Sequence, residues 1–274
     1  MAFEPTPLRL TLASLLLLLT TIFLRILTIL PSRRPPAPPR TSPSHILIVL
    51  GSGGHTAEML SMIRSLSPDR YIYRTYLVSS GDAFSTLKAI DFERRLTGAE
   101  TTTRDKKNPA IVRGQGFEIL TVPRARRIHQ PLYTAPLTSL LCLLSCLRFL
   151  APSHPRQALN TPQRLGTYTP TTPDVLLTNG PATGVLVLIA AFILRFLGVV
   201  RGEGTRCVYV ESWARVGGLS LSGRIVEGLG LAERFLVQWE RGLGRQGGGE
   251  VVVGGGKVVG RRRGRREWRG FLVE

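Results

Sequence analysis

Cysteine, aromatic and acidic residues are all scarce in this chain of 274 residues. The three cysteines, Cys142, Cys146 and Cys207, are odd in number and lack zinc-ligand spacing, which excludes a disulfide framework and a structural zinc site. Aromatic residues make up 7%, which is little for a protein that binds nucleic acid by base stacking. Only 18 acidic residues oppose 36 basic ones, which excludes an acidic disordered protein.

The remaining composition is basic and moderately hydrophobic. A net charge of +18 favours an anionic partner, which is a nucleic acid, an anionic membrane surface or a phosphorylated substrate. Hydrophobic residues make up 43%, enough for a real core, and the length allows one larger domain or two small ones.

The longest apolar run, residues 8–30, carries only Arg9 and Arg25 as charges. As a helix it would be about 34 Å long, enough to cross a hydrocarbon core of about 30 Å. A cleaved signal peptide is the alternative, but its apolar core is shorter, and its cleavage site needs a small-x-small pattern such as Ala-x-Ala, which Pro31–Arg34 lacks. We therefore predict an uncleaved anchor over residues 1–31.

Arginines cluster after this anchor, at Arg33, Arg34 and Arg40. The positive-inside bias then places the C-terminal body in the cytoplasm. Residues 32–44 are rich in proline and serine and predict a stiff, extended linker.

Beyond the linker, short apolar runs alternate with runs of helical spacing. Strands are expected at 45–50, 71–78, 117–122, 174–177, 206–210 and 235–237. Helices are expected at 56–66, 83–96, 131–150 and 183–200. Because short turns follow the strands, the pattern predicts an α/β fold with a Rossmann-like parallel sheet over 45–241 and ligands at the carboxyl ends of its strands.

Five segments depart from this regular pattern. Residues 98–116 are expected to form a loop and residues 151–173 an insertion. The apolar helices at 131–150 and 183–200 leave a second membrane span or interfacial contact open, although the strand and turn before 183–200 favour a core helix or one lying against the bilayer. The Gly/Arg-rich tail, 242–274, predicts disorder, and a solvated tail or one near anionic lipid is favoured over nucleic-acid binding.

A glycine-rich turn, Gly51-Ser52-Gly53-Gly54-His55, joins the first expected strand and helix. Glycines let backbone amides approach a ligand, and a helix N-terminus favours an anion, so the turn suits a phosphate. It lacks the lysine of a Walker A loop and the third glycine of the dinucleotide fingerprint, and a tight turn without ligand is the alternative. His55 could act as a general base or as a hydrogen-bond donor to a diphosphate. The alternative is that it is only a polar residue near the helix cap.

Two further groups of charged residues follow other strands. Glu211 and Arg215 lie four apart, which suits a polar ligand and equally a structural ion pair. Arg124, Arg126 and Arg127 form a basic turn that suits a phosphate or a lipid headgroup, and a solvated basic loop is the alternative.

The segment at 49–59, VLGSGGHTAEM, resembles the opening motif of the membrane-anchoring subunits of the eukaryotic two-subunit UDP-N-acetylglucosamine transferase. Similar segments follow in the family's order: PRARRIHQ (123–130), TNGP (178–181), VESWARV (210–216), LSLSG (219–223), AERFLVQW (232–239) and WRGFLV (268–273). Several ordered motifs are specific where the glycine turn alone is not. Residues 242–266 depart from the family pattern.

The resemblance implies a fold similar to the acceptor-binding half of a GT-B glycosyltransferase. The chain would form a heterodimer with a soluble, donor-binding catalytic subunit and would anchor it at the cytoplasmic face of the endoplasmic reticulum membrane or the nuclear envelope. The pair would transfer the second GlcNAc from UDP-GlcNAc, held by the partner, to GlcNAc-diphosphate-dolichol. The resemblance implies no cofactor, no metal and no activity of this chain alone.

Site residues follow from the motifs together with the resemblance. His55 and then Glu211 are candidates for the base that deprotonates the acceptor hydroxyl. The acceptor and its diphosphate are expected at Gly51, Ser52, Gly53, Gly54, Thr56, Arg124, Arg127, Asn179, Gly180 and Arg215. The partner is expected to contact Phe271, Leu272 and Val273.

Two other functions remain open at this point. The first is a membrane scaffold that recruits a catalytic partner without contributing a catalytic residue. The second is a tethered basic protein whose tail binds nucleic acid or lipid headgroups.

Overall fold

The structure is a computed structural model. It describes residues 7–35, 43–98, 102–104, 111–114, 116–126, 130–156, 159–160, 167–168, 172–200, 204–239, 241, 249–253, 257–263 and 266–268. Arg127 and the expected partner-contacting residues 271–273 lie outside this part of the chain.

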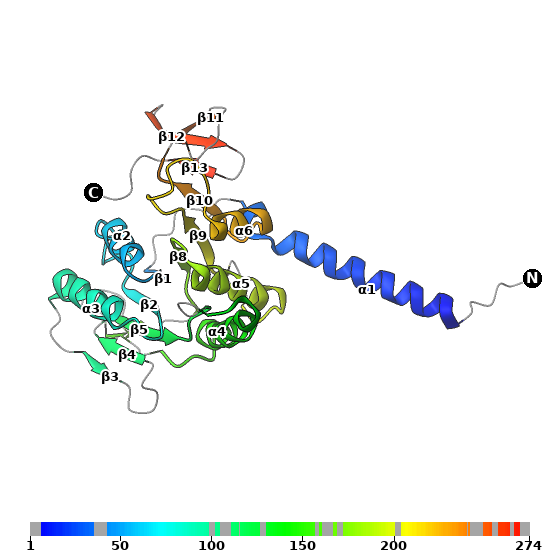
Figure 1. Ribbon diagram of the computed structural model, residues 1–274, viewed down its shortest axis with the longest axis horizontal. Helices are drawn as coiled ribbons and strands as arrows, with labels where there is room; N and C mark the ends of the chain where they lie inside the picture. The colour runs from blue at the N-terminus through cyan, green and yellow to red at the C-terminus, as the bar shows by residue number, and fades with distance from the viewer. Residues whose placement is uncertain are drawn as a thin grey trace, which may run out of the picture.

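A parallel sheet forms the centre of the molecule (Figure 1). Its parallel strands lie in the order β5 (Phe117–Val122), β2 (Tyr73–Ser79), β1 (His45–Leu50), β8 (Val175–Thr178), β9 (Arg206–Val210) and β10 (Arg234–Val237). Numbered along the chain this order is 3-2-1-4-5-6, that of a Rossmann sheet. The prediction of a Rossmann-like α/β fold is therefore confirmed, and the strand order reverses between β1 and β8.

Additional strands widen the sheet at both edges. Beside β5 lie β4 (Ile111–Gly114) and β3 (Thr103–Arg104), and beside β10 lie β13 (Arg266–Trp268), β12 (Lys257–Arg263) and β11 (Gly249–Val253). A separate pair, β6 (Leu159–Asn160) and β7 (Thr167–Tyr168), lies within the predicted insertion. The predictions of a loop over 98–116 and of a disordered tail were thus wrong for these strands. An open sheet edge offers unpaired backbone groups, which a segment without a clear strand pattern can pair with.

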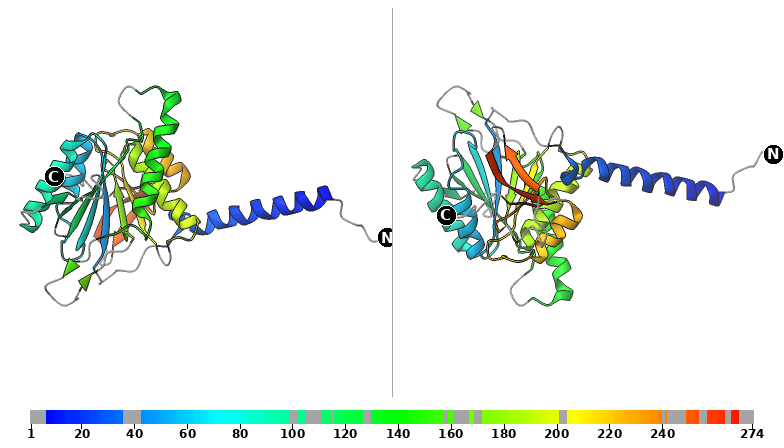
Figure 2. Two further views of the ribbon diagram at one scale, coloured as in Figure 1. Left: turned by 90° about the horizontal axis from the view of Figure 1, so that it is seen from below. Right: turned by 90° about the horizontal axis from the view of Figure 1, so that it is seen from above.

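Helices cover the two faces of the sheet (Figure 2). One face carries α2 (Gly54–Met62) and α3 (Ala83–Thr97), and the other carries α4 (Ala135–Leu150), α5 (Ala182–Phe196) and α6 (Leu221–Leu229). Side chains of β1 alternate between the two cores: Ile46 and Ile48 pack in the core under α2 and α3, and Leu47 and Val49 in the core under α4, α5 and α6. All six residues of β1 are buried because helices cover both faces of the sheet, as the continuous apolar run at 45–50 predicts.

The apolar helices α4 and α5 differ in how much of their surface is covered. More than half of the residues of α5, including Val187 and Leu188, are buried, so α5 is a helix of the core. The short 3₁₀ helix η2 (Leu132–Thr134) precedes α4, which buries Cys142 and Cys146 and exposes a row of leucines. Both helices are shorter than a membrane span requires.

The N-terminal helix α1 (Pro7–Ile29) projects away from the domain (Figures 1 and 2). Among the described residues it alone is long and apolar enough to cross a membrane, as predicted. The short 3₁₀ helix η1 (Pro31–Arg33) follows and packs on the domain, with Ser32 N donating to Gly230 O at 3.1 Å. The start of the linker is thus docked on the domain, because its backbone groups find partners there, and is not the extended spacer that its composition predicts.

Candidate functional site

The glycine-rich turn lies at the carboxyl end of β1, beside the point where the strand order reverses. Gly53 has φ of 61° and caps α2, a conformation that favours glycine. A Cβ atom at Gly51 would lie 2.7 Å from His55 Cβ and 2.8 Å from Pro181 Cδ. Ser52, Gly53 and Gly54 are exposed, so the turn presents its outer side to solvent at the N-terminus of a helix.

Thr56 supports the turn from inside the protein. Its side chain is buried, donates to Gly51 O and lies 2.6 Å from Ser85 Oγ. Ser85 Oγ in turn donates to Asp82 Oδ2 at 2.7 Å. Of the residues expected to bind the diphosphate, Thr56 is therefore placed behind the exposed surface of the turn.

The buried carboxylate of Glu58 joins the loops that follow three neighbouring strands. It accepts hydrogen bonds from Trp213 N at 2.7 Å, from Ser212 Oγ at 3.1 Å, from Asn179 Nδ2 at 3.3 Å and from Gln238 Nε2. Sequence reasoning gave Glu58 no role, although its position three residues after His55 places both on one face of α2.

His55 lies between this buried acid and solvent. Its Nδ1 atom is 3.7 Å from Glu58 Oε2, and its side chain is 37% exposed. Its backbone oxygen accepts a hydrogen bond of 2.9 Å from Asn179 Nδ2, which ties the turn to the end of β8. Asn179 is itself buried, and Gly180 follows it with φ of 83°. The structure therefore brings His55, Asn179 and Gly180 together beside the glycine turn.

Glu211, the second candidate base, is turned toward the start of α6. Its carboxylate accepts from Ser212 N at 3.2 Å, Ser220 N at 3.1 Å and Ser220 Oγ at 3.2 Å. A Cβ atom at Gly223 would lie 2.1 Å from Glu211 Oε2, so α6 starts directly against this carboxylate. Burial raises the pKa of Glu211, while the bonds from Ser220 and Ser212 and the charge of Arg215 act in the opposite direction.

The arginines expected at the site lie in loops that follow strands other than β1. Arg215 is exposed in the loop after β9, and its backbone N donates to Ser212 O at 2.9 Å. Arg124 follows β5, two strands from β1 and thus about 10 Å along the sheet. Its Nε donates to Ser80 O at 2.9 Å, and Arg126 donates to Gln130 O.

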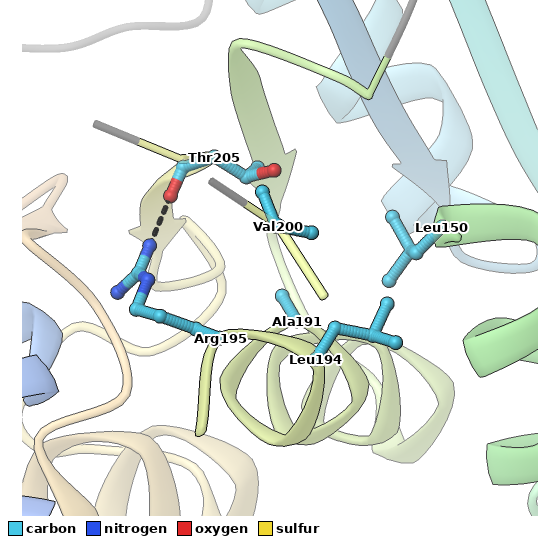
Figure 3. A pocket seen from close by; sticks show the side chains of 6 residues that line it. All are labelled: Leu150, Ala191, Leu194, Arg195, Val200 and Thr205. Atoms are coloured by element: carbon cyan, nitrogen blue, oxygen red, sulfur yellow. Dashed lines mark hydrogen bonds between the residues drawn. The ribbon is translucent and has the colours of Figure 1, made fainter. Parts of the chain in front are cut away.

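Two hollows lie among the helices. A groove of about 380 Å³ lies between α2 and α3 and is lined by apolar residues together with Ser61, Arg64, Lys88 and Arg95. A smaller hollow at the far end of α5 is lined by Leu150, Ala191, Leu194, Arg195, Val200 and Thr205 (Figure 3).

The fold and the site define an α/β protein of Rossmann type, with an N-terminal helix that fits a membrane anchor and polar loops gathered at the switch point of its sheet. A family model described as "Oligosaccharide biosynthesis protein Alg14 like" matches residues 46–246, and the chain belongs to this family. The family predicted from the sequence motifs is thereby confirmed.

Curated relatives carry the name UDP-N-acetylglucosamine transferase subunit Alg14. The protein from Aspergillus fumigatus is 39% identical over 69% of this chain and 93% of its own length. The proteins from Cryptococcus neoformans and Rattus norvegicus are 36% and 33% identical, over 81% and 76% of this chain and 86% and 80% of their own lengths. A crystal structure of MurG from Acinetobacter baumannii aligns at 14% identity with a TM-score of 0.39, covering 73% of this chain and 43% of that one.

Proposed function

We propose that this chain is the membrane-anchoring, acceptor-binding subunit of a UDP-GlcNAc transferase that adds the second GlcNAc to GlcNAc-diphosphate-dolichol. The observation that carries the proposal is the exposed glycine turn at the switch point of the sheet, in a chain that also has the apolar helix α1. The names of the relatives support the reaction class and the presence of a second subunit.

A diphosphate acceptor fits the chemistry of the turn. Gly53 and Gly54 are exposed, and nothing lies within 4 Å of a Cβ atom built on either, which leaves room for a ligand. Backbone amides and the positive end of the α2 dipole favour the negative charge of a diphosphate. Arg215 and Arg124 stand farther out along the same edge, where they add positive charge around it.

His55 is favoured over Glu211 as the base that accepts the proton of the acceptor hydroxyl. The His55 ring is partly exposed, so it can reach an acceptor hydroxyl, and the buried Glu58 carboxylate 3.7 Å behind its Nδ1 atom can orient the ring. Glu211 is buried and already accepts three hydrogen bonds from its own chain, which suits it to positioning the loop and α6.

The outward face of α4 is apolar, which supports the proposal that the domain lies on a membrane and receives an acceptor that stays in the bilayer. Leu137, Leu140, Leu141 and Leu144 are 49–64% exposed and follow helical spacing along one stripe. Figure 2 shows that α1 leaves the molecule on this same side of the sheet. Together with the arginines after α1, these features support a domain lying on the cytoplasmic surface of the endoplasmic reticulum membrane.

The donor UDP-GlcNAc is assigned to a soluble partner, with which the chain forms a heterodimer. The described chain has one Rossmann-like sheet, and the edge of this sheet that carries the turn is open to solvent at Ser52 and Arg215. A second subunit over this edge would complete the site. The last residues, Phe271–Val273, are proposed to contact it.

Sugar transfer in membranes tests the proposal. We would supply UDP-GlcNAc and a GlcNAc-diphosphate-lipid to this chain alone, to the chain with the soluble subunit, and to the His55→Ala variant with the same subunit. We expect product only from the two chains together, and a loss of roughly a hundredfold or more in the variant because general-base catalysis contributes about 10²–10⁴-fold.

Partner binding by His55→Ala serves as the control. If the variant binds the partner and transfers sugar at the normal rate, His55 is not the base, and the same normal rate in Glu211→Gln would leave the chain as a membrane scaffold. If the two normal chains form a complex that makes no product, the transferase assignment itself is wrong.

A further inference from the structure

The chain between α1 and the sheet is fastened to the domain at several points, all of them remote from the candidate site. Ile29 and Pro31 are buried at the end of α1 and the start of η1. Ser32 N donates to Gly230 O at 3.1 Å, and Arg206 Nη1 donates to Pro35 O at 2.8 Å. Up to Pro35, the anchor is therefore not attached through a free spacer.

Glu233, between α6 and β10, lies at the centre of these contacts. Its Oε1 atom accepts a hydrogen bond from Arg34 Nη1 at 2.8 Å and lies 3.4 Å from Arg195 Nη1. Its Oε2 atom accepts from Cys207 N at 2.6 Å. The side chains of Arg34, Arg195 and Glu233 are only 14%, 11% and 7% exposed, so salt screens their attraction less than that of a surface pair. We call these three residues the anchor clamp.

Two arginines interlock the last turns of α1 and α5. Arg195 Nη1 donates to Ile29 O at 3.3 Å, and its Nη2 donates to Thr205 O, as Figure 3 shows. Arg25 of α1 reaches the other way and donates to Arg195 O at 3.1 Å and Phe196 O at 3.4 Å. A cation at the carbonyl end of a helix is favourable, so α5 holds α1 through both its side chain and its terminus.

The helix α5 connects this docking point with the candidate site. It starts at Ala182, directly after Pro181, which touches the glycine turn, and it ends at Phe196 beside the anchor. Its 15 residues span about 22 Å. The anchor clamp and the turn are therefore at opposite ends of one buried, rigid helix.

We propose that the anchor clamp holds the domain in one orientation on α1, so that the glycine turn stands where the diphosphate of a membrane-embedded acceptor emerges from the bilayer. This inference rests on the proposed function. A lipid-linked acceptor cannot leave the membrane, so the rate of transfer depends on how the site is oriented toward the lipid surface. Arg34, Arg195 and Glu233 are positioning residues in this scheme, and none of them touches the acceptor.

A distance measurement tests the orientation directly. Spin labels on the full chain in nanodiscs, at Ala13→Cys on α1 and Lys88→Cys on α3, report the distance between anchor and domain. The native cysteines are buried and do not compete for the label. We expect a narrow distance distribution with the intact clamp and a broad one in Arg34→Met and Glu233→Gln. Arg33→Met is the matched control, because Arg33 neighbours Arg34, carries the same charge and is exposed.

A comparison of two acceptors tests the consequence for transfer. With the soluble partner present, we expect Arg34→Met to lower transfer to a long-chain lipid acceptor in liposomes roughly tenfold, and transfer to a short-chain, water-soluble acceptor hardly at all. Arg33→Met should change neither rate. A general loss of folding would reduce both rates together, and thermal unfolding of each variant separates that outcome.

Two results would overturn the inference: a distance distribution that stays narrow in both Arg34→Met and Glu233→Gln, or a broadened one with an unchanged ratio of the two transfer rates. Absence of transfer by the unaltered pair would instead refute the proposed function, and the distance measurement would still decide whether the clamp fixes the domain.

Discussion

Glu58 is a buried acid whose hydrogen-bond donors all come from other parts of the chain. Its partners lie between 121 and 180 residues away in sequence, in the loops after β8, β9 and β10. A carboxylate accepts several bonds at once, whereas a side-chain amide offers only one oxygen. The arrangement of the site loops therefore depends on the two accepting oxygens of this one residue.

Replacing Glu58 by glutamine tests this role. We expect Glu58→Gln to lower the free energy of unfolding by about 2–3 kcal/mol, because each buried donor left unpaired costs about 1–3 kcal/mol. Sugar transfer with the partner should fall as well, since the loops around His55 lose an acceptor that they share. Denaturant unfolding of the chain in detergent gives the first quantity and the membrane assay the second.

Asp91→Asn is the matched control for this prediction. Asp91 pairs with Arg94 at 3.8 Å on the exposed side of α3, with side chains about half exposed. Loss of such a pair is worth about 0.5 kcal/mol or less. Equal effects of the two substitutions would contradict the central position of Glu58.

At the scale of the element, the turn between β1 and α2 offers a pair of glycines with opposite surroundings. A Cβ atom at Gly51 would press on His55 and Pro181, whereas one at Gly54 would meet nothing within 4 Å. We expect Gly51→Ala to cost about 1–3 kcal/mol of stability through overpacking. We expect Gly54→Ala to change stability by about 0.5 kcal/mol or less, since alanine is well suited to a helix.

The same pair separates structure from ligand binding. If a diphosphate occupies the open space beside Gly54, Gly54→Ala should raise the acceptor KM roughly tenfold, equivalent to about 1.4 kcal/mol, at nearly unchanged stability. Steady-state kinetics at varied acceptor concentration measures this. An unchanged KM would place the diphosphate away from the turn.

Elements differ in how far the sequence alone predicts them. The strand β1, the turn and α2 are contiguous, so their apolar run, glycines and helical spacing can be read directly. The contacts of Glu58 and Glu233 join distant segments and become visible only when the sheet is assembled. The edge strands β11–β13 escape prediction because their valines lie among glycines and arginines, and their pairing depends on the edge of the assembled sheet.

At the scale of the whole molecule, the two helical layers have different surroundings. The layer of α4, α5 and α6 lies on the side from which α1 departs, and α2 and α3 lie on the other (Figure 2). Leu140 on α4 and Leu87 on α3 are 50% and 61% exposed, so exposure alone does not distinguish them. Their positions relative to α1 do distinguish them, because α4 lies on the side from which α1 departs. We therefore predict that Leu140, and not Leu87, contacts lipid.

Tryptophan substitution at these two leucines makes the orientation measurable. We expect the added fluorescence of Leu140→Trp to be quenched by brominated lipids in liposomes, because its side chain lies in the interfacial region into which aromatic rings partition. Leu87→Trp should not be quenched, since α3 faces away from the bilayer. The signal of the three native tryptophans is subtracted with the unaltered chain. Quenching at position 87 without quenching at 140 would mean that α3, and not α4, faces the bilayer. The glycine turn would then have to receive its acceptor from the opposite side.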